Sequence, residues 1–234
     1  MNNECAATPL DVFRTDAFMF GDDITVKLAS KHKASGFALG QSTWTGAILL
    51  SRALVNETTE GDGGWSVKDR TCLELGCGTG LAGFTALVLH CKQCTFTDCS
   101  LPALCDLRHS VKLLHQDVQG GAEIRRHVWE SDIPDNIGRP VRHWSNADTC
   151  DDASFRPPAL DDHAVYDCVI AADVLYFENQ VHPLVHTLQR RLKRGGFALF
   201  LVTVRARTTA TVRTFEEALT SAGFCMSSFD TQLL

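Results

Sequence analysis

The stretch TCLELGCGTGLAGF, from Thr71 to Phe84, decides how the rest of this sequence is interpreted. It begins as an apolar run typical of a buried strand, yet it carries a carboxylate, Glu74, and then breaks into alternating glycines. Tight glycines after a strand let the backbone approach a ligand at the N-terminus of the following helix. The stretch therefore predicts a ligand-binding turn between a strand and a helix.

Strand and helix patterns alternate on both sides of this turn, which predicts an α/β fold with a doubly wound, mostly parallel sheet. Strands are expected at 70–76, 93–98, 122–130, 166–177, 197–205 and 224–234. Helices are expected at 43–56, 80–90, 101–115, 178–194 and 211–223.

The length of 234 residues and the 44% content of hydrophobic residues suit one α/β domain. We expect this domain at 43–234, after an N-terminal extension at 1–42 that holds an edge strand within DITVKLASKHK. The loop at 131–163 combines several prolines with clustered aspartates, and this composition predicts disorder.

Composition also limits the partners. The formal charge of -6 argues against a nucleic-acid partner, because binding the phosphate backbone calls for positive charge. No membrane span or secretory signal is visible, so we expect a soluble protein in the cytoplasm, with the nucleus as the alternative compartment. The ten cysteines lie in apolar segments as often as in loops, and Cys91 and Cys94 form the single Cys-x-x-Cys pair. These cysteines are expected to be reduced, with no metal bound.

Two registers of the glycines predict different ligands. Gly78-x-Gly80-x-x-Gly83 fits the dinucleotide-binding fingerprint, and Asp98 lies 20 residues beyond Gly78, near where a ribose-binding acid belongs. In this register, however, Glu74 would occupy a position where a dinucleotide-binding strand normally buries an apolar side chain.

The other register, Glu74-x-Gly76-x-Gly78-x-Gly80, places the carboxylate at the carboxyl-terminal mouth of the strand, beside the ligand. There the carboxylate can face the ammonium group of a cationic cofactor such as S-adenosylmethionine, whereas it would repel a pyrophosphate. In either register Asp98 ends the next strand, where it can accept hydrogen bonds from both ribose hydroxyls. The sequence therefore favours the cationic ligand, and a dehydrogenase remains a minor alternative.

Four segments carry a resemblance to a known family: GQSTWTGAILLSRAL before the first strand, LELGCGTGLAG, VWES after the third strand, and VIAADVLYF at the fourth. With them the chain resembles the seven-β-strand S-adenosylmethionine-dependent methyltransferases. More narrowly, it is similar to the protein-lysine methyltransferases that modify chaperones and translation factors. The resemblance implies S-adenosyl-L-methionine as the cofactor and a chaperone or translation factor as the substrate.

The resemblance also implies which residues contact the cofactor. Trp44 would line the pocket around its methionine end, and Trp129 would pack beside the adenine, where an indole face can stack. The other implied contacts are small residues that let the cofactor lie against the backbone: Gly76, Gly78, Gly80 and Ala172.

Asp173 and Tyr176, at the end of the fourth strand, are the implied catalytic residues. The acid would orient the acceptor amine, and the phenol would line its channel. Methylation of histidine, arginine or a small molecule is an alternative activity. A non-catalytic cofactor-binding or interaction protein is an alternative from another class.

The chain departs from the family pattern at its C-terminal end. After the last helix only FCMSSFDTQLL remains, which is enough for one strand. The expected order therefore lacks the seventh strand of the family sheet, which would leave an edge of the fifth strand unpaired. The sequence does not indicate an oligomeric state.

Overall fold

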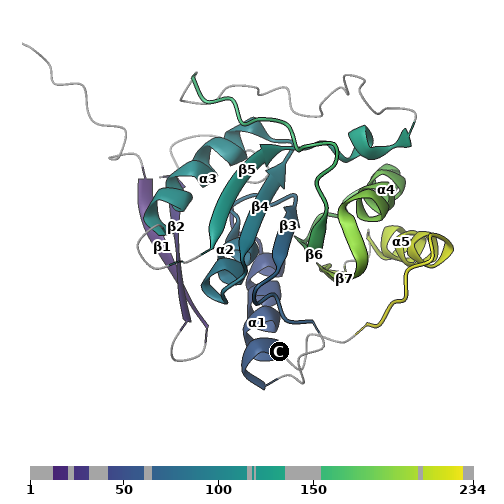
Figure 1. The fold of residues 1–234 in the computed structure, drawn as a ribbon, viewed down its shortest axis with the longest axis horizontal. Coiled ribbons are helices and arrows are strands. Elements are labelled where there is room, and N and C mark those ends of the chain that lie inside the picture. The colour runs from purple at the N-terminus through teal and green to yellow at the C-terminus, as the bar shows by residue number, and fades with distance from the viewer. Residues whose placement is uncertain are drawn as a thin grey trace, which may run out of the picture.

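The computed structural model of the protein describes residues 13–20, 24–31, 42–60, 65–114, 118, 120–134, 154–204 and 208–228. Within these ranges one parallel sheet has the strand order β5-β4-β3-β6-β7 (Figure 1). Its strands are β3 (Thr71–Leu75), β4 (Gln93–Asp98), β5 (Gly121–Arg126), β6 (Tyr166–Ala172) and β7 (Leu192–Leu201). The predicted doubly wound α/β fold is confirmed.

Helices cover both faces of this sheet (Figure 1). One face carries α1 (Thr45–Glu60), α2 (Leu81–Val88) and α3 (Leu101–Leu114), and the other carries α4 (Val181–Arg191) and α5 (Thr209–Ser221). The crossovers change face between β3 and β6, which are adjacent in the sheet. In such folds ligands bind at this switch point, outside the carboxyl ends of the strands.

The side chains of β3 divide the core between the two faces, because successive residues of a strand point in opposite directions. Cys72 packs with α1, α2 and α3, whereas Leu73 and Leu75 pack with α4 and α5. Glu74 shares the face of Cys72, so its carboxylate is directed toward α2 rather than along the strand.

A separate antiparallel hairpin, β1 (Phe13–Phe20) and β2 (Ile24–Lys31), lies beside α3 (Figure 1, purple). Val26 and Leu28 of β2 are buried, and the Ser110 hydroxyl of α3 accepts the Ala29 amide at 2.9 Å. The sequence predicted β2 but missed β1.

Several predicted elements need correction. The strands predicted at 166–177 and 197–205 end earlier, at Ala172 and Leu201. Residues 192–194 were expected in a helix, but α4 ends at Arg191 because Leu192 is extended and pairs with Tyr166 of β6. Trp129 was expected in a strand, but β5 ends at Arg126 and Trp129 begins a 3₁₀ helix, η2 (Trp129–Asp132). The strand predicted at 224–234 is wrong over 224–228, which form no strand, and 229–234 lie outside the described residues.

The disorder predicted for 131–163 is wrong at both ends of that loop. Asp132 is buried at one end, and at the other the Leu160 amide donates to the Arg126 carbonyl at 3.1 Å. Residues 135–153 lie outside the described residues. No helix in the described ranges is long and apolar enough to cross a membrane.

The turn between β3 and α2 passes three times through the left-handed region, with φ of 59° at Gly76, 51° at Gly78 and 79° at Gly80. Side chains with a Cβ rarely adopt this conformation, which explains the alternating glycines. Gly83 serves a different purpose, since a Cβ there would overlap the Glu74 carboxylate and the Phe96 ring.

Glu74 caps the N-terminus of α2. Its Oε2 accepts the Gly83 amide at 3.1 Å, one of the first-turn donors that have no partner within the helix. Burial raises the pKa of Glu74 to about 8; the Gly83 bond opposes this shift, and the charge of Asp98 adds to it. The folded protein therefore holds a proton that the unfolded chain releases near pH 4.5.

We predict that Glu74 makes the protein less stable as the pH rises from 4.5 to about 8. In this window the unfolded state loses the proton that the folded state keeps, so the free energy of unfolding falls by about 1.4 kcal/mol per pH unit. Glu74→Gln cannot titrate and should lack this decline. Urea unfolding of both proteins at several pH values measures the difference, and identical pH profiles would contradict the raised pKa.

Candidate active site

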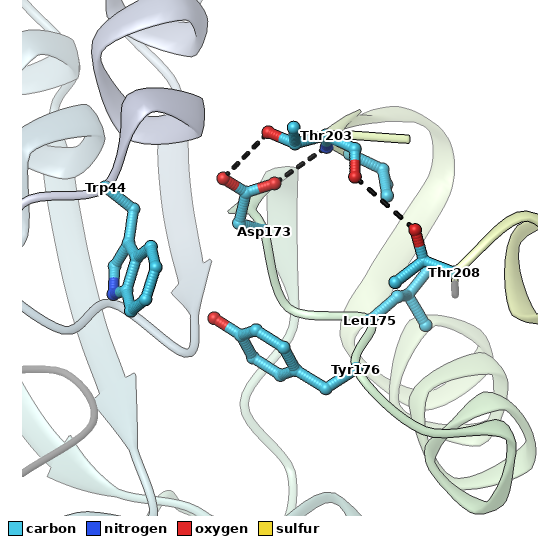
Figure 2. Close-up of a pocket in the computed structure, with 7 residues that line it drawn as sticks. Trp44, Asp173, Leu175, Tyr176, Thr203 and Thr208 are labelled. Atoms are coloured by element: carbon cyan, nitrogen blue, oxygen red, sulfur yellow. Dashed lines mark hydrogen bonds between the residues drawn. The ribbon is translucent and has the colours of Figure 1, made fainter. Parts of the chain in front are cut away.

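A cleft opens at the carboxyl edge of the sheet, beside the ends of β6 and β7 (Figure 2). The space that water can enter within it is small, about 20 Å³, and the cleft is partly open to solvent. Its lining is mostly apolar, with one carboxylate and three hydroxyls, and consists of Trp44, Asp173, Leu175, Tyr176, Val202, Thr203 and Thr208. The structure thus brings the predicted residues Trp44, Asp173 and Tyr176 together in one cleft.

Asp173 joins three segments through its carboxylate. Oδ1 accepts the Thr203 amide at 2.7 Å, and Oδ2 accepts the Thr203 hydroxyl at 3.0 Å and the Gly46 amide at 3.1 Å. Its backbone is left-handed, with φ of 52°, and its own amide donates to the Leu201 carbonyl at 2.8 Å. A non-glycine residue in this conformation is uncommon, so surrounding bonds must hold it in place.

The start of α1 is held against the cleft by two contacts. A Cβ at Gly46 would overlap the Asp173 carboxylate, so only glycine lets the helix approach this closely. Just before the helix, the Thr43 hydroxyl lies 3.0 Å from the Thr79 hydroxyl of the glycine turn. These contacts connect the wall that carries Trp44 to both the cleft and the turn.

Trp44 and Tyr176 face each other across the opening (Figure 2). Each is 37% exposed, and the Tyr176 hydroxyl points toward the side on which Trp44 lies. The Gln180 side chain accepts the amides of Tyr176 and Phe177, both at 3.0 Å, and so fixes the backbone that carries the phenol. An aromatic pair at a cleft mouth can shield an alkyl chain from water while an amine enters.

Asp98 lies at the end of β4, against the glycine turn. Its two oxygens accept the Gly78 amide at 3.0 Å and the Ser100 amide at 2.8 Å. Burial raises the pKa of Asp98, and the two amide bonds oppose the shift. A carboxylate has about four lone-pair positions. Asp98 therefore keeps acceptor capacity for further hydroxyl donors.

Trp129 lies next to the same turn. A Cβ built on Gly76 would be 3.7 Å from its ring and 2.9 Å from Val174, which follows β6. The turn after β3, the residues after β6 and the indole therefore meet at the switch point. Ala172 ends β6, where it pairs with Leu201, so it also lies at this edge of the sheet.

The predicted placement of Glu74 is wrong. The side chain was expected at the mouth of its strand, facing the ammonium of a ligand, but it is 3% exposed and bound to the Gly83 amide beneath α2. The alternation of β3 explains the difference, since both faces of this strand are buried.

The sequence analysis missed Thr203, Thr208, Leu175 and Val202, which line the cleft. A weak signal was present for Thr203, because it is the first polar residue after the apolar run of β7. Its bonds to Asp173 depend on tertiary contacts that no periodicity reveals.

Two curated relatives are similar to this chain. Methyltransferase-like protein 22 of Mus musculus is 31% identical over 175 residues, which is 71% of this chain and 40% of the relative. Protein N-terminal and lysine N-methyltransferase efm7 of Neurospora crassa is 27% identical over 183 residues, which is 78% of this chain and 58% of the relative. The chain thus spans about half the length of these relatives.

Solved structures with a similar fold are also methyltransferases by name. SMU.776, complexed with SAH, matches with a TM-score of 0.55 at 14% identity, over 92% of this chain and 47% of that one. An RNA methyltransferase, PH1948 from Pyrococcus horikoshii, matches with a TM-score of 0.50 at 14% identity, over 83% of this chain and 76% of that one. At this identity the likeness supports the fold alone.

The sequence profile of one family covers most of the chain. It matches residues 22–143 and 154–221, and so includes the glycine turn, Asp98, Trp129 and the segment from Asp173 to Tyr176. The family is described as lysine methyltransferase. This chain belongs to the lysine methyltransferase family.

Proposed function

We propose that the protein transfers a methyl group from S-adenosyl-L-methionine to a lysine side chain of a protein substrate. The observation that carries the proposal is the cleft formed by Trp44, Asp173 and Tyr176 at the switch point of the sheet, beside the glycine turn. Family membership and the name of the Neurospora crassa relative support lysine methylation, and the name of the Mus musculus relative supports methyl transfer. Chaperones or translation factors as substrates, and a cytoplasmic location, stay predictions from the sequence.

The glycine turn and its neighbours suit an adenosyl cofactor. The left-handed backbone at Gly76, Gly78 and Gly80 carries no side chain at these three positions, so a ligand can approach the main chain there. Asp98 can accept ribose hydroxyls, and Trp129 offers a ring face beside the turn. When bound, the cofactor supplies an electrophilic methyl group.

The same turn suits a dinucleotide less well. A pyrophosphate binds through the free amides of a glycine turn and of the helix that follows it. Here the amides of Gly78, Gly80 and Gly83 already donate to Asp98, to the Cys77 carbonyl and to Glu74. The amides that a pyrophosphate would need are therefore already engaged.

The cleft suits an amine acceptor. A lysine must lose a proton before it can attack a methyl group, and its ordinary pKa is about 10.4. The apolar walls from Trp44, Leu175 and Val202 would lower that pKa by removing water. The Asp173 carboxylate, which is bonded on both oxygens, can orient the incoming ammonium with its remaining lone pair.

Incubation of cell lysate with radiolabelled cofactor and the purified protein tests the proposal. A labelled protein band whose hydrolysate contains methyllysine is the expected result. Label in methylhistidine, methylarginine or small solutes would contradict lysine as the acceptor. No label with a protein that binds S-adenosylhomocysteine would indicate a non-catalytic binding protein.

Asp98→Ala should weaken the binding of S-adenosylhomocysteine by about 1.5 to 3 kcal/mol, because hydrogen bonds to a charged group are lost. Calorimetry measures this change. Glu123→Ala, which removes an exposed acid from the neighbouring strand β5, is the control and should bind normally. Unchanged affinity in the Asp98 variant, or tighter binding of a nicotinamide dinucleotide by the wild type, would reject the assigned cofactor site.

Tyr176→Phe should leave S-adenosylhomocysteine affinity intact and slow methyl transfer on the order of tenfold to a hundredfold, since small misplacements at a reacting centre are costly. Tyr166→Phe changes the other tyrosine of the chain, at the start of β6, and should retain full turnover. Turnover on the labelled substrate, measured beside calorimetry, gives both quantities. Full activity of the Tyr176 variant would contradict the assignment of the phenol to the acceptor site.

A further inference from the structure

Asp132 and Arg191 form a buried ion pair between η2 and α4. The side chain of Asp132, at the end of η2, has no exposed surface, and Arg191, at the end of α4, is 1% exposed. Arg191 binds both carboxylate oxygens, with Nε at 3.1 Å from Oδ2 and Nη2 at 2.7 Å from Oδ1. Two-point bonding of this kind fixes orientation as well as distance.

Two further groups complete the bonding of Asp132. The His127 Nε2 lies 2.9 Å from Oδ2, and Arg190 Nη1 donates to Oδ1 at 3.2 Å. Burial by itself raises the pKa of Asp132, but the bonds from His127 and Arg191 outweigh it and leave the pKa below its ordinary value. Asp132 therefore carries its charge inside the protein.

Arg191 uses its remaining nitrogen to hold the segment before β6. Its Nη1 donates to the carbonyls of Asp161 and Asp162 at 2.6 and 3.1 Å, with a longer bond to Ala164 at 3.3 Å. One guanidinium thus connects α4, η2 and this segment, which otherwise come from distant parts of the chain.

Two of the groups joined to Asp132 support residues of the cofactor site. Trp129, beside Gly76, is the first residue of the short helix that Asp132 ends. His127 donates its backbone amide to the Asp98 carbonyl at 3.2 Å, so the residue that binds Asp132 is also tied to the end of β4. Displacement of Asp132 would therefore move supports of both Trp129 and Asp98.

We propose that Asp132 and the two arginines that bind it, Arg190 and Arg191, are positioning residues for the cofactor: they hold the Trp129 turn and the end of β4 in the geometry that binds the adenosyl group. This inference rests on the proposed cofactor site. A pair that only stabilises the fold would change the melting temperature and leave the affinity of the folded protein unaltered. A positioning pair changes the affinity of a protein that is still folded.

The test compares three variants by calorimetry with S-adenosylhomocysteine, after circular dichroism has established that each is folded. Asp132→Asn keeps the size of the side chain and removes its charge, and we expect at least a tenfold loss of affinity. Arg190→Ala removes a partner that is 20% exposed, and we expect about a threefold loss. Lys193→Ala breaks the exposed Asp167–Lys193 pair near the amino ends of β6 and β7, and should bind normally.

Turnover provides a second measurement. At saturating cofactor the Asp132 and Arg190 variants should keep kcat within about twofold of the wild type, while KM for the cofactor rises in step with the loss of affinity. Loss of kcat with an unchanged KM would place the effect at the acceptor cleft and overturn the inference.

The inference is overturned if the folded Arg190 variant, and the Asp132 variant where it folds, bind as tightly as the wild type. Should Asp132→Asn fail to fold, the Arg190 variant decides alone. A wild-type protein that fails to bind S-adenosylhomocysteine would also overturn it. A wild-type protein that binds this ligand but methylates no lysine would contradict the proposed activity. In that case calorimetry on the same variants still decides the positioning role.

Discussion

In the first turn of two helices next to the site, a glycine amide is bound by a carboxyl group from a strand or from the residue that follows a strand. Glu74 binds the Gly83 amide at the start of α2, and Asp173 binds the Gly46 amide at the start of α1. In both places the missing Cβ creates the room that the carboxylate occupies. One unpaired first-turn amide of each helix is thus satisfied by a carboxyl group, which helps to set where the helix starts.

The geometry of the site follows from these two caps. The cap on α2 fixes the exit of the glycine turn, and Asp98 binds the Gly78 amide within that turn. The cap on α1 places Trp44 opposite Tyr176, and Asp173 also holds the end of β7 through Thr203. A cofactor position and an acceptor position are therefore built from neighbouring loops at one switch point of the sheet.

Much of this arrangement follows from sequence patterns. The glycine turn and Asp98 were predicted from the strand and glycine patterns, because the ends of parallel strands meet at one edge. The roles of Trp129 and the Asp173 segment came from the family resemblance. Side-chain direction was harder to infer. A buried carboxylate on β3 has no apolar alternation to reveal its face, and the Asp132–Arg191 pair joins residues 59 apart that only tertiary packing brings together. Thr203 was missed for the same reason.

A crystal structure of the protein with S-adenosylhomocysteine tests the central claim most directly. The account predicts that the ribose hydroxyls bind Asp98, that the adenine lies beside Trp129, and that the sulfur points toward the cleft between Trp44 and Tyr176. A ligand bound away from the glycine turn, or one whose sulfur faces away from that cleft, would contradict it.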